Sequence, residues 1–100
     1  MALFFTIKSH WKKKGEIVNK YLRLALAQFN PITGHLSYNR DKIISFIQEA
    51  EKQKADIVVF PELALTGYPP EDLLLKKHFI DDSLKELNYI CQQVGDIIVY

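Results

Sequence analysis

The sequence has a single cysteine, Cys91, so no disulfide can form within the chain. This scarcity is typical of proteins from a reducing compartment. No apolar stretch approaches the ~20 residues that a membrane-spanning helix needs. The apolar start at residues 2–5 is also too short for the core of a signal peptide. We therefore expect a cytoplasmic protein with no membrane partner.

Motifs for nucleotides and metals are missing as well. The chain has no Gly-x-Gly-x-x-Gly pattern and no Walker phosphate loop. Its three histidines, His10, His35 and His78, do not have the spacing of metal ligands. With one cysteine, a zinc site is not expected. The sequence thus predicts that this segment binds no metal and no cofactor.

Charge is unevenly distributed along the chain. Residues 1–20 carry five lysines and one glutamate, while residues 21–100 carry eight basic and eleven acidic side chains. A body with a slight acidic excess is not the footprint of a nucleic-acid-binding protein. The lysines at residues 12–14 are interpreted as a solvated run.

Apolar patterns predict alternating strands and helices from residue 21 onward, and no clear period before it. Residues 21–28 are nearly all apolar, which is typical of a strand buried on both faces. Asn39 is the predicted N-cap of a helix that carries Asp41 in its first turn and ends near Lys54. Residues 57–60 predict a second strand, which Pro61 closes.

The second half of the chain predicts further helices and a last strand. Pro70 is placed to start a short helix, with Glu71 and Asp72 in its first turn. Asp81 or Asp82 is the predicted cap of a longer helix. The predicted inner face of that helix consists of Leu84, Leu87, Cys91 and Val94. Residues 97–100 predict a third strand.

The resulting β-α-β-α-β order predicts an α/β fold with parallel strands joined by right-handed crossovers. Two or three strands backed by two helices leave one sheet face and one edge uncovered. The chain is therefore expected to be the first part of a larger domain.

One acidic residue follows directly on a predicted strand. The apolar run at residues 57–60 ends at Pro61, and Glu62 comes next. Ligands of open α/β sheets bind at the carboxyl ends of the strands, so Glu62 is a candidate general base. On the local pattern alone, a solvated loop glutamate is the more frequent outcome.

Residues 60–74, FPELALTGYPPEDLL, resemble the nitrilase, or carbon–nitrogen hydrolase, superfamily. The continuation to Leu75, with Phe79 soon after, is similar to the glutaminase domain of glutamine-dependent NAD synthetases. A second block, LALAQFNP at residues 24–31 followed by TGHL and Asn39, is similar to the opening strand and loop of the same domain. These synthetases commonly have an acidic residue where His35 stands. The resemblance covers about residues 22–100.

This resemblance implies the N-terminal portion of an α-β-β-α sandwich. Residues 1–21 are then an N-terminal extension, and residues 22–100 are an incomplete glutaminase domain. One hypothesis is that translation starts near Leu22, which mass spectrometry of the native N-terminus would test.

The superfamily hydrolyses amides with a cysteine nucleophile, a glutamate base and a lysine that stabilises the oxyanion. Glu62 matches the base. Tyr68 is expected to line the glutamine pocket or the ammonia path, or else to pack as a structural residue over the turn.

The cysteine and the lysine of the superfamily are not matched in this chain. Cys91 is interpreted as a small buried hydrophobic residue. Lys76 and Lys77 are interpreted as solvated. Glu71 and Asp72 are interpreted as stabilising a helix N-terminus through its dipole rather than as an acid–base pair.

The resemblance also implies an activity for the parent protein. The first domain would hydrolyse glutamine, and a second domain would use the ammonia to convert deamido-NAD to NAD with ATP and Mg²⁺. The segment alone is expected to be inactive without the missing C-terminal remainder, and the parent is expected to be a homo-oligomer. Two alternatives remain open: another nitrilase-type amidase, such as an ω-amidase or carbamoylase, and a truncated non-catalytic α/β module. The coding sequence after Tyr100 would separate them.

Overall fold

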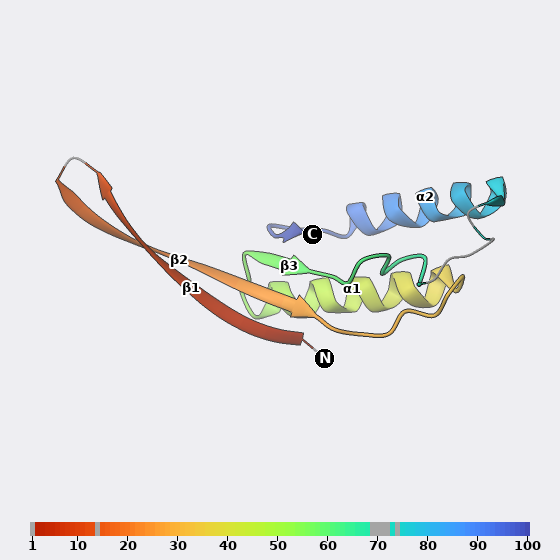
Figure 1. Ribbon diagram of the computed structural model, residues 1–100, viewed down its shortest axis with the longest axis horizontal. Helices are drawn as coiled ribbons and strands as arrows, with labels where there is room; N and C mark the ends of the chain where they lie inside the picture. The colour runs from red at the N-terminus through yellow and green to blue at the C-terminus, as the bar shows by residue number, and fades with distance from the viewer. Residues whose placement is uncertain (1, 14, 69–72, 74) are drawn as a thin grey trace.

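A computed structural model describes residues 2–13, 15–68, 73 and 75–100. Within them, a four-stranded sheet has the order β1-β2-β3-β4, with β1 antiparallel to β2 and the other pairs parallel. The elements are β1 (Ala2–Lys13), β2 (Glu16–Ala27), α1 (Leu36–Lys52), β3 (Ile57–Val59), α2 (Lys77–Gln92) and β4 (Ile98–Val99) (Figure 1). The predicted α/β class is confirmed, and the predicted β-α-β-α-β order holds from β2 onward. The short helix expected at Pro70 lies outside the described residues.

The N-terminal residues form a strand that the sequence pattern did not predict. Strand β1 pairs with β2 along its whole length, from Ala2 opposite Ala27 to Lys13 opposite Glu16. Gly15, with a φ of 80°, lies in the turn between them, where a residue with a side chain would be strained. The molecule measures 58 × 25 × 24 Å, and the hairpin extends beyond the helices (Figure 1). The division into an extension and a domain near residue 21 stays a prediction.

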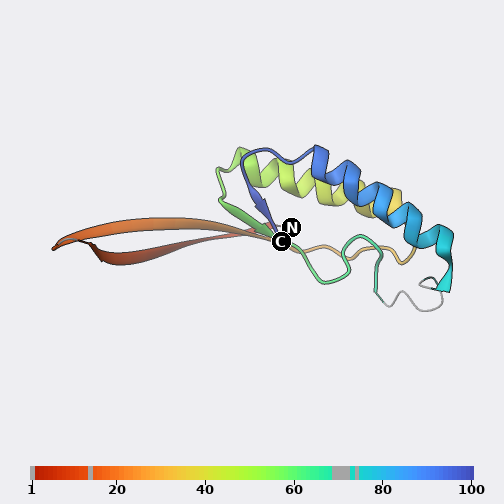
Figure 2. The same cartoon turned by 90° about the horizontal axis from the view of Figure 1, so that it is seen from above.

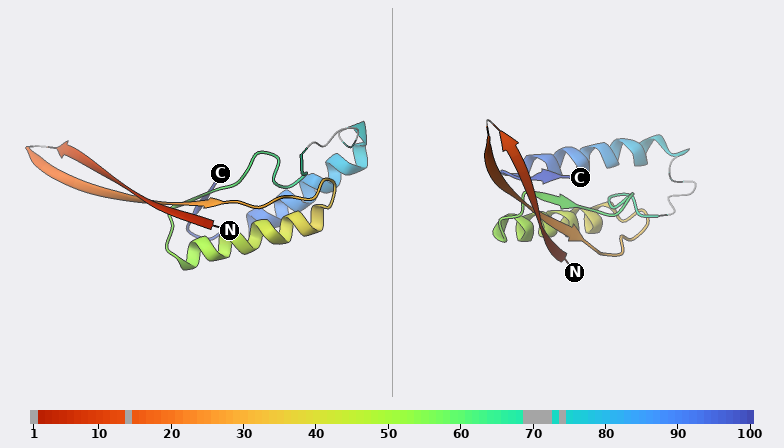
Figure 3. Two further views of the ribbon diagram at one scale, coloured as in Figure 1. Left: turned by 60° about the horizontal axis from the view of Figure 1, so that its bottom comes forward. Right: turned by 60° about the vertical axis from the view of Figure 1, so that its left-hand side comes forward.

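Helices α1 and α2 lie side by side on one face of the sheet (Figure 2). Ala25 and Ala27 of β2 and Val58 of β3 face them, and Ile47 of α1 is completely buried there. Alanines at these strand positions allow close approach of a helix, which supports tight packing. The expected burial of residues 21–28 on both sheet faces is wrong for the described residues, since their other face, as seen in Figure 3, has no covering element.

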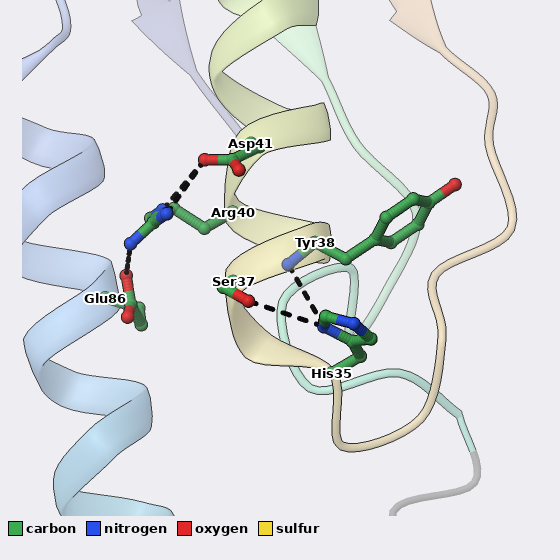
Figure 4. A network of polar contacts seen from close by, with 6 residues as sticks. All are labelled: His35, Ser37, Tyr38, Arg40, Asp41 and Glu86. Atoms are coloured by element: carbon green, nitrogen blue, oxygen red, sulfur yellow. Dashed lines mark hydrogen bonds and ion pairs between the residues drawn. The ribbon is translucent and has the colours of Figure 1, made fainter.

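Helix α1 begins earlier than predicted. Its N-cap is His35, whose Nδ1 accepts a hydrogen bond from the backbone N–H of Tyr38 at 3.3 Å (Figure 4). The prediction of Asn39 as N-cap, with Asp41 in the first turn, is therefore wrong. Asn39 lies inside the helix with no exposed surface, because its amide bonds to loop backbone at the helix's buried side.

Helix α2 also differs from its prediction. It begins at Lys77 with Lys76 at the N-cap, so Asp81 and Asp82 lie in its interior and cap nothing. The earlier start places Phe79 on the buried side of the helix, in line with Ile90. Burial of this large ring favours helix over the local capping preference of aspartate.

The predicted inner face of α2 is mostly wrong. Leu84 is 55% exposed, Leu87 is 47% exposed and Cys91 is exposed, whereas Val94 packs against the core. The physical reason is that the core contacts the stripe that contains Ile90. Leu87 only borders this contact, in a crevice that it shares with Ile43 and Ile90. Cys91 is therefore not the buried residue that its apolar neighbours indicated.

An ion pair joins the two helices. The Arg40 guanidinium donates to the Glu86 carboxylate at 2.9 Å and contacts Asp41 at 3.0 Å (Figure 4). Hydrogen bonds to Glu86 and to Asp41 raise the pKa of Arg40 above its ordinary value. The guanidinium also lies over the ring of Tyr89, 5.1 Å from its centroid, so one side chain ties α1 to two positions on α2.

Candidate functional site

The carboxyl ends of β2 and β3 lie next to each other because the two strands are parallel. A cluster of three rings anchors the chain where it leaves them. The ring centroid of Phe29, after β2, lies 6.5 Å from that of Phe60, after β3. The ring centroid of Phe46 of α1 lies 5.6 Å from that of Phe29 and 6.3 Å from that of Phe60. Stacked and edge-to-face rings at these separations are favourable beyond their buried area. The two loops therefore start from a fixed, apolar base.

A crevice of about 490 Å³ lies between these loops. The loop after β2 contributes Phe29, Asn30 and Pro31, and the loop after β3 contributes Pro61, Glu62 and Tyr68. The two predicted site residues, Glu62 and Tyr68, thus line the same crevice at the strand ends. The Glu62 side chain is exposed, and Tyr68 is 74% exposed.

Glu62 also borders a second crevice, of about 520 Å³, on its other side. The walls of this crevice are mainly apolar and include Phe60, Leu87, Ile90 and Tyr100. A carboxylate that borders two crevices is placed to take a proton from a group that enters either one.

A larger crevice, of about 700 Å³, lies elsewhere, between the starts of α1 and α2. His35, Lys76, His78 and Asp82 are among its lining residues. His78 Nε2 and Asp82 lie 3.9 Å apart on one exposed helix face, beyond hydrogen-bond distance. We place the candidate site at the 490 Å³ crevice, because there the loops after β2 and β3 bring Glu62 and Tyr68 together at the strand ends.

Backbone contacts hold the two loops together behind the Glu62 crevice. Gly34 N–H donates to Thr66 O at 2.9 Å from one loop to the other, and Gly67 N–H donates to Leu63 O at 2.8 Å within the loop after β3. Gly67 has a φ of 83°, and a Cβ there would lie 2.5 Å from Thr33 Cα. Only glycine fits this conformation and this approach.

The residue next to Glu62 has an unusual backbone. Leu63 has a φ of 58°, in the left-handed region, which costs a residue with a side chain about 1–3 kcal/mol. Such a conformation persists where the surrounding contacts impose it, and these residues cluster at functional sites.

Asn39 is the residue of this region whose role the sequence analysis missed. Its Oδ1 accepts from Ile32 N–H, and its Nδ2 donates to Ile32 O and to Leu65 O, each at 2.8 Å. The amide therefore joins α1 to both loops. Leaving one of these backbone groups buried and unpaired costs about 1–3 kcal/mol. The available signal was its spacing, since Asn39 precedes Ile43 and Ile47 at four-residue intervals on the buried stripe.

The other predicted positions lie away from the crevice. Lys76 and Lys77 are exposed at the start of α2, as expected, and Cys91 is exposed near its end. Among the described residues, no three His, Cys, Asp or Glu side chains come together as a metal site requires. In the same part of the chain, no helix has the length and apolar character needed to cross a membrane.

Residues 23–100 match the family model described as carbon-nitrogen hydrolase. The match includes both loops of the Glu62 crevice and both helices. The chain therefore belongs to the carbon–nitrogen hydrolase family.

The relatives point to one branch of this family. The chain is 53% identical over 78 residues to a glutamine-dependent NAD(+) synthetase of Xanthomonas campestris, covering 77% of the chain and 14% of the relative. It is 42% identical over 78 residues to the synthetase of that name from Thermotoga maritima, covering 78% of the chain and 14% of the relative. The chain spans 12–15% of the length of the curated relatives it matches.

Solved structures agree with this branch. The glutamine-dependent NAD(+) synthetase of Cytophaga hutchinsonii superposes with a TM-score of 0.74 at 29% identity, over 78% of this chain and 13% of that chain. The glutamine-dependent NAD(+) synthetase of Acinetobacter baumannii, solved in complex with ADP, gives a TM-score of 0.69 at 39% identity. The match covers 76% of this chain and 14% of that chain. The fold predicted for residues 22–100 is therefore that of solved relatives.

Proposed function

We propose that this chain is the N-terminal part of the glutaminase domain of a glutamine-dependent NAD synthetase. The observation that carries the proposal is the placement of Glu62 at the joined ends of β2 and β3, in a crevice shared with Tyr68. Relatives that bear this name match over most of the chain, which supports the branch.

In this proposal Glu62 is the general base. Its carboxylate accepts the proton of a cysteine thiol, because the thiolate and not the thiol is the nucleophile. The thiolate attacks the side-chain amide carbon of glutamine, and Glu62 returns the proton to the departing ammonia. Water then hydrolyses the thioester to glutamate. The cysteine, and a lysine that stabilises the oxyanion, come from sequence outside these 100 residues, since Cys91, Lys76 and Lys77 lie away from the crevice.

The ammonia is proposed to amidate deamido-NAD in another domain of the complete enzyme, with ATP and Mg²⁺. The ADP in the Acinetobacter baumannii structure supports a nucleotide site in that relative. Tyr68 is proposed to contact glutamine or the departing ammonia. The low cysteine content supports the expected cytoplasmic location, and we keep a homo-oligomer as the expected assembly.

The test compares two half-reactions of the complete enzyme that contains this segment. Glu62→Gln keeps the shape of the side chain but removes the base, so glutamine hydrolysis should fall by about a hundredfold or more. NAD formation from added ammonia should stay within about twofold, because that step does not need the base. Glutamine hydrolysis without NAD formation in the wild type would favour another amidase of the family. Unchanged glutamine hydrolysis in Glu62→Gln would refute the proposed base.

A further inference from the structure

The loop that carries Glu62 has little local structure of its own. Between Pro61 and Tyr68 the described chain forms turns, and Leu63 is in the left-handed region. The Glu62 side chain is exposed, and its placement relative to the crevice depends on what fixes the following residues. Those residues are fixed from behind, by the helix and by the neighbouring loop.

Asn39 is the point at which these contacts converge. It is completely buried, and its amide bonds at 2.8 Å to Leu65 O in the Glu62 loop and to both backbone groups of Ile32 in the other loop. Leu65 lies three residues after Glu62, and Ile32 follows Pro31, which lines the opposite wall of the crevice. One side chain therefore bonds to the loops on both sides of the crevice.

We propose that Asn39 is a positioning residue. By bonding to both loops, it fixes where the Glu62 carboxylate lies relative to the opposite wall of the crevice. The same two loops also meet where Gly34 bonds to Thr66 and where Gly67 packs against Thr33. Asn39 does not line the Glu62 crevice, so it acts through the loops and not on a substrate. This inference rests on the proposed role of Glu62 as general base.

The experiment is a double-mutant cycle in the complete enzyme, with glutamine hydrolysis as the readout. Asn39→Ala alone should lower kcat about tenfold to a hundredfold, the scale of a misplaced catalytic group, with KM within about threefold. In a Glu62→Asp background, where the carboxylate is already displaced, adding Asn39→Ala should lower kcat by less than about threefold. Ammonia-driven NAD formation should stay within about twofold throughout.

Ile47→Ala is the matched control, because Ile47 lies on the same face of α1 and is equally buried, but its apolar side chain makes no hydrogen bond to either loop. It should lower thermal stability while leaving kcat per folded molecule unchanged. An equal kcat loss from Asn39→Ala in both backgrounds, or an equal loss from Ile47→Ala, would overturn the positioning role.

If Asn39→Ala does not fold, Asn39→Asp replaces it in the cycle, since the isosteric carboxylate keeps the acceptor for Ile32 N–H and loses both donors. Failure of both to fold while Ile47→Ala folds would mean that Asn39 serves the fold alone, against the proposal. Full activity of Glu62→Gln would instead reject the proposed function itself. If Glu62→Gln is inactive but the effects of the Asn39 and Glu62→Asp substitutions on kcat simply add, only the positioning role of Asn39 is rejected.

Discussion

Helix α1 buries Asn39, Ile43, Ile47 and Ala50, whereas the buried residues of the similarly long α2 in the described structure are Phe79 and Ile90. Both helices lie on the same sheet face. The difference lies in how many neighbours each one finds there. Helix α1 contacts both the sheet and the two site loops, while α2 contacts α1 and the edge of the sheet around β4.

The exposed surface of α2 carries an apolar stripe, while α1 has its apolar side buried. Ile80, Leu84 and Leu87 are 43–55% exposed, and Cys91 extends the stripe at the next helical interval. Spacings of four, three and four residues are those of a helix face that packs against another element. The contrast shows that contacts within this segment bury the apolar face of α1. They bury the Phe79–Ile90 side of α2 but leave its second apolar stripe, from Ile80 to Cys91, largely exposed.

The largest effect on this comparison is expected from the core of α1. Ile47→Ala removes a completely buried side chain between sheet and helix, so the free energy of unfolding should fall by about 3 kcal/mol. Urea denaturation followed by circular dichroism measures this loss, and Ile47→Val should lose about 1 kcal/mol. A loss below that of the valine variant would show that α1 is not the better-packed helix.

A smaller effect is expected at the contact between the helices. Glu86→Gln removes the charge that pairs with Arg40 across the α1–α2 junction, so the free energy of unfolding should fall by about 1 kcal/mol. The same denaturation experiment at high salt should reduce the difference, because salt screens a partly exposed pair. Asp82→Asn, a charge change on α2 away from Arg40, is the control. Equal losses from the two variants would exclude a specific role of the pair.

The smallest effect is expected on the exposed stripe of α2. Leu84→Ala removes a side chain that is 55% exposed, so stability should change by no more than about 0.5 kcal/mol. Urea denaturation in parallel with Ile47→Ala provides the matched comparison. A loss as large as that of Ile47→Ala would mean that Leu84 is covered in the protein, and the contrast between the helices would disappear.

The sequence predicted best where the signal was local. The β-branched run at residues 57–59, closed by Pro61 and followed by Glu62, identifies both a strand and the candidate residue at its carboxyl end without reference to the rest of the chain. The candidate base could therefore be named from the local pattern, whereas Tyr68 was named through the family resemblance.

The errors arose where distant residues decide the local structure. Asn39 reads as a helix cap, but its partner Leu65 lies 26 residues away and draws it into the buried side of α1. The buried ring of Phe79 likewise sets the start of α2 against the capping preference of Asp81 and Asp82. The loop junction behind Glu62 depends on such long-range contacts, so no pattern in a single stretch predicts it.

The hairpin of β1 and β2 determines where the sheet can be enlarged. Since β1 runs along the full length of β2, the backbone groups on that side are already paired. In the described structure the two outer edges of the sheet are therefore β1 and β4, and Ile98 of β4 is 63% exposed. An additional strand can therefore dock beside β1 or β4, whereas β2 could gain a new neighbour only if residues 2–13 were displaced.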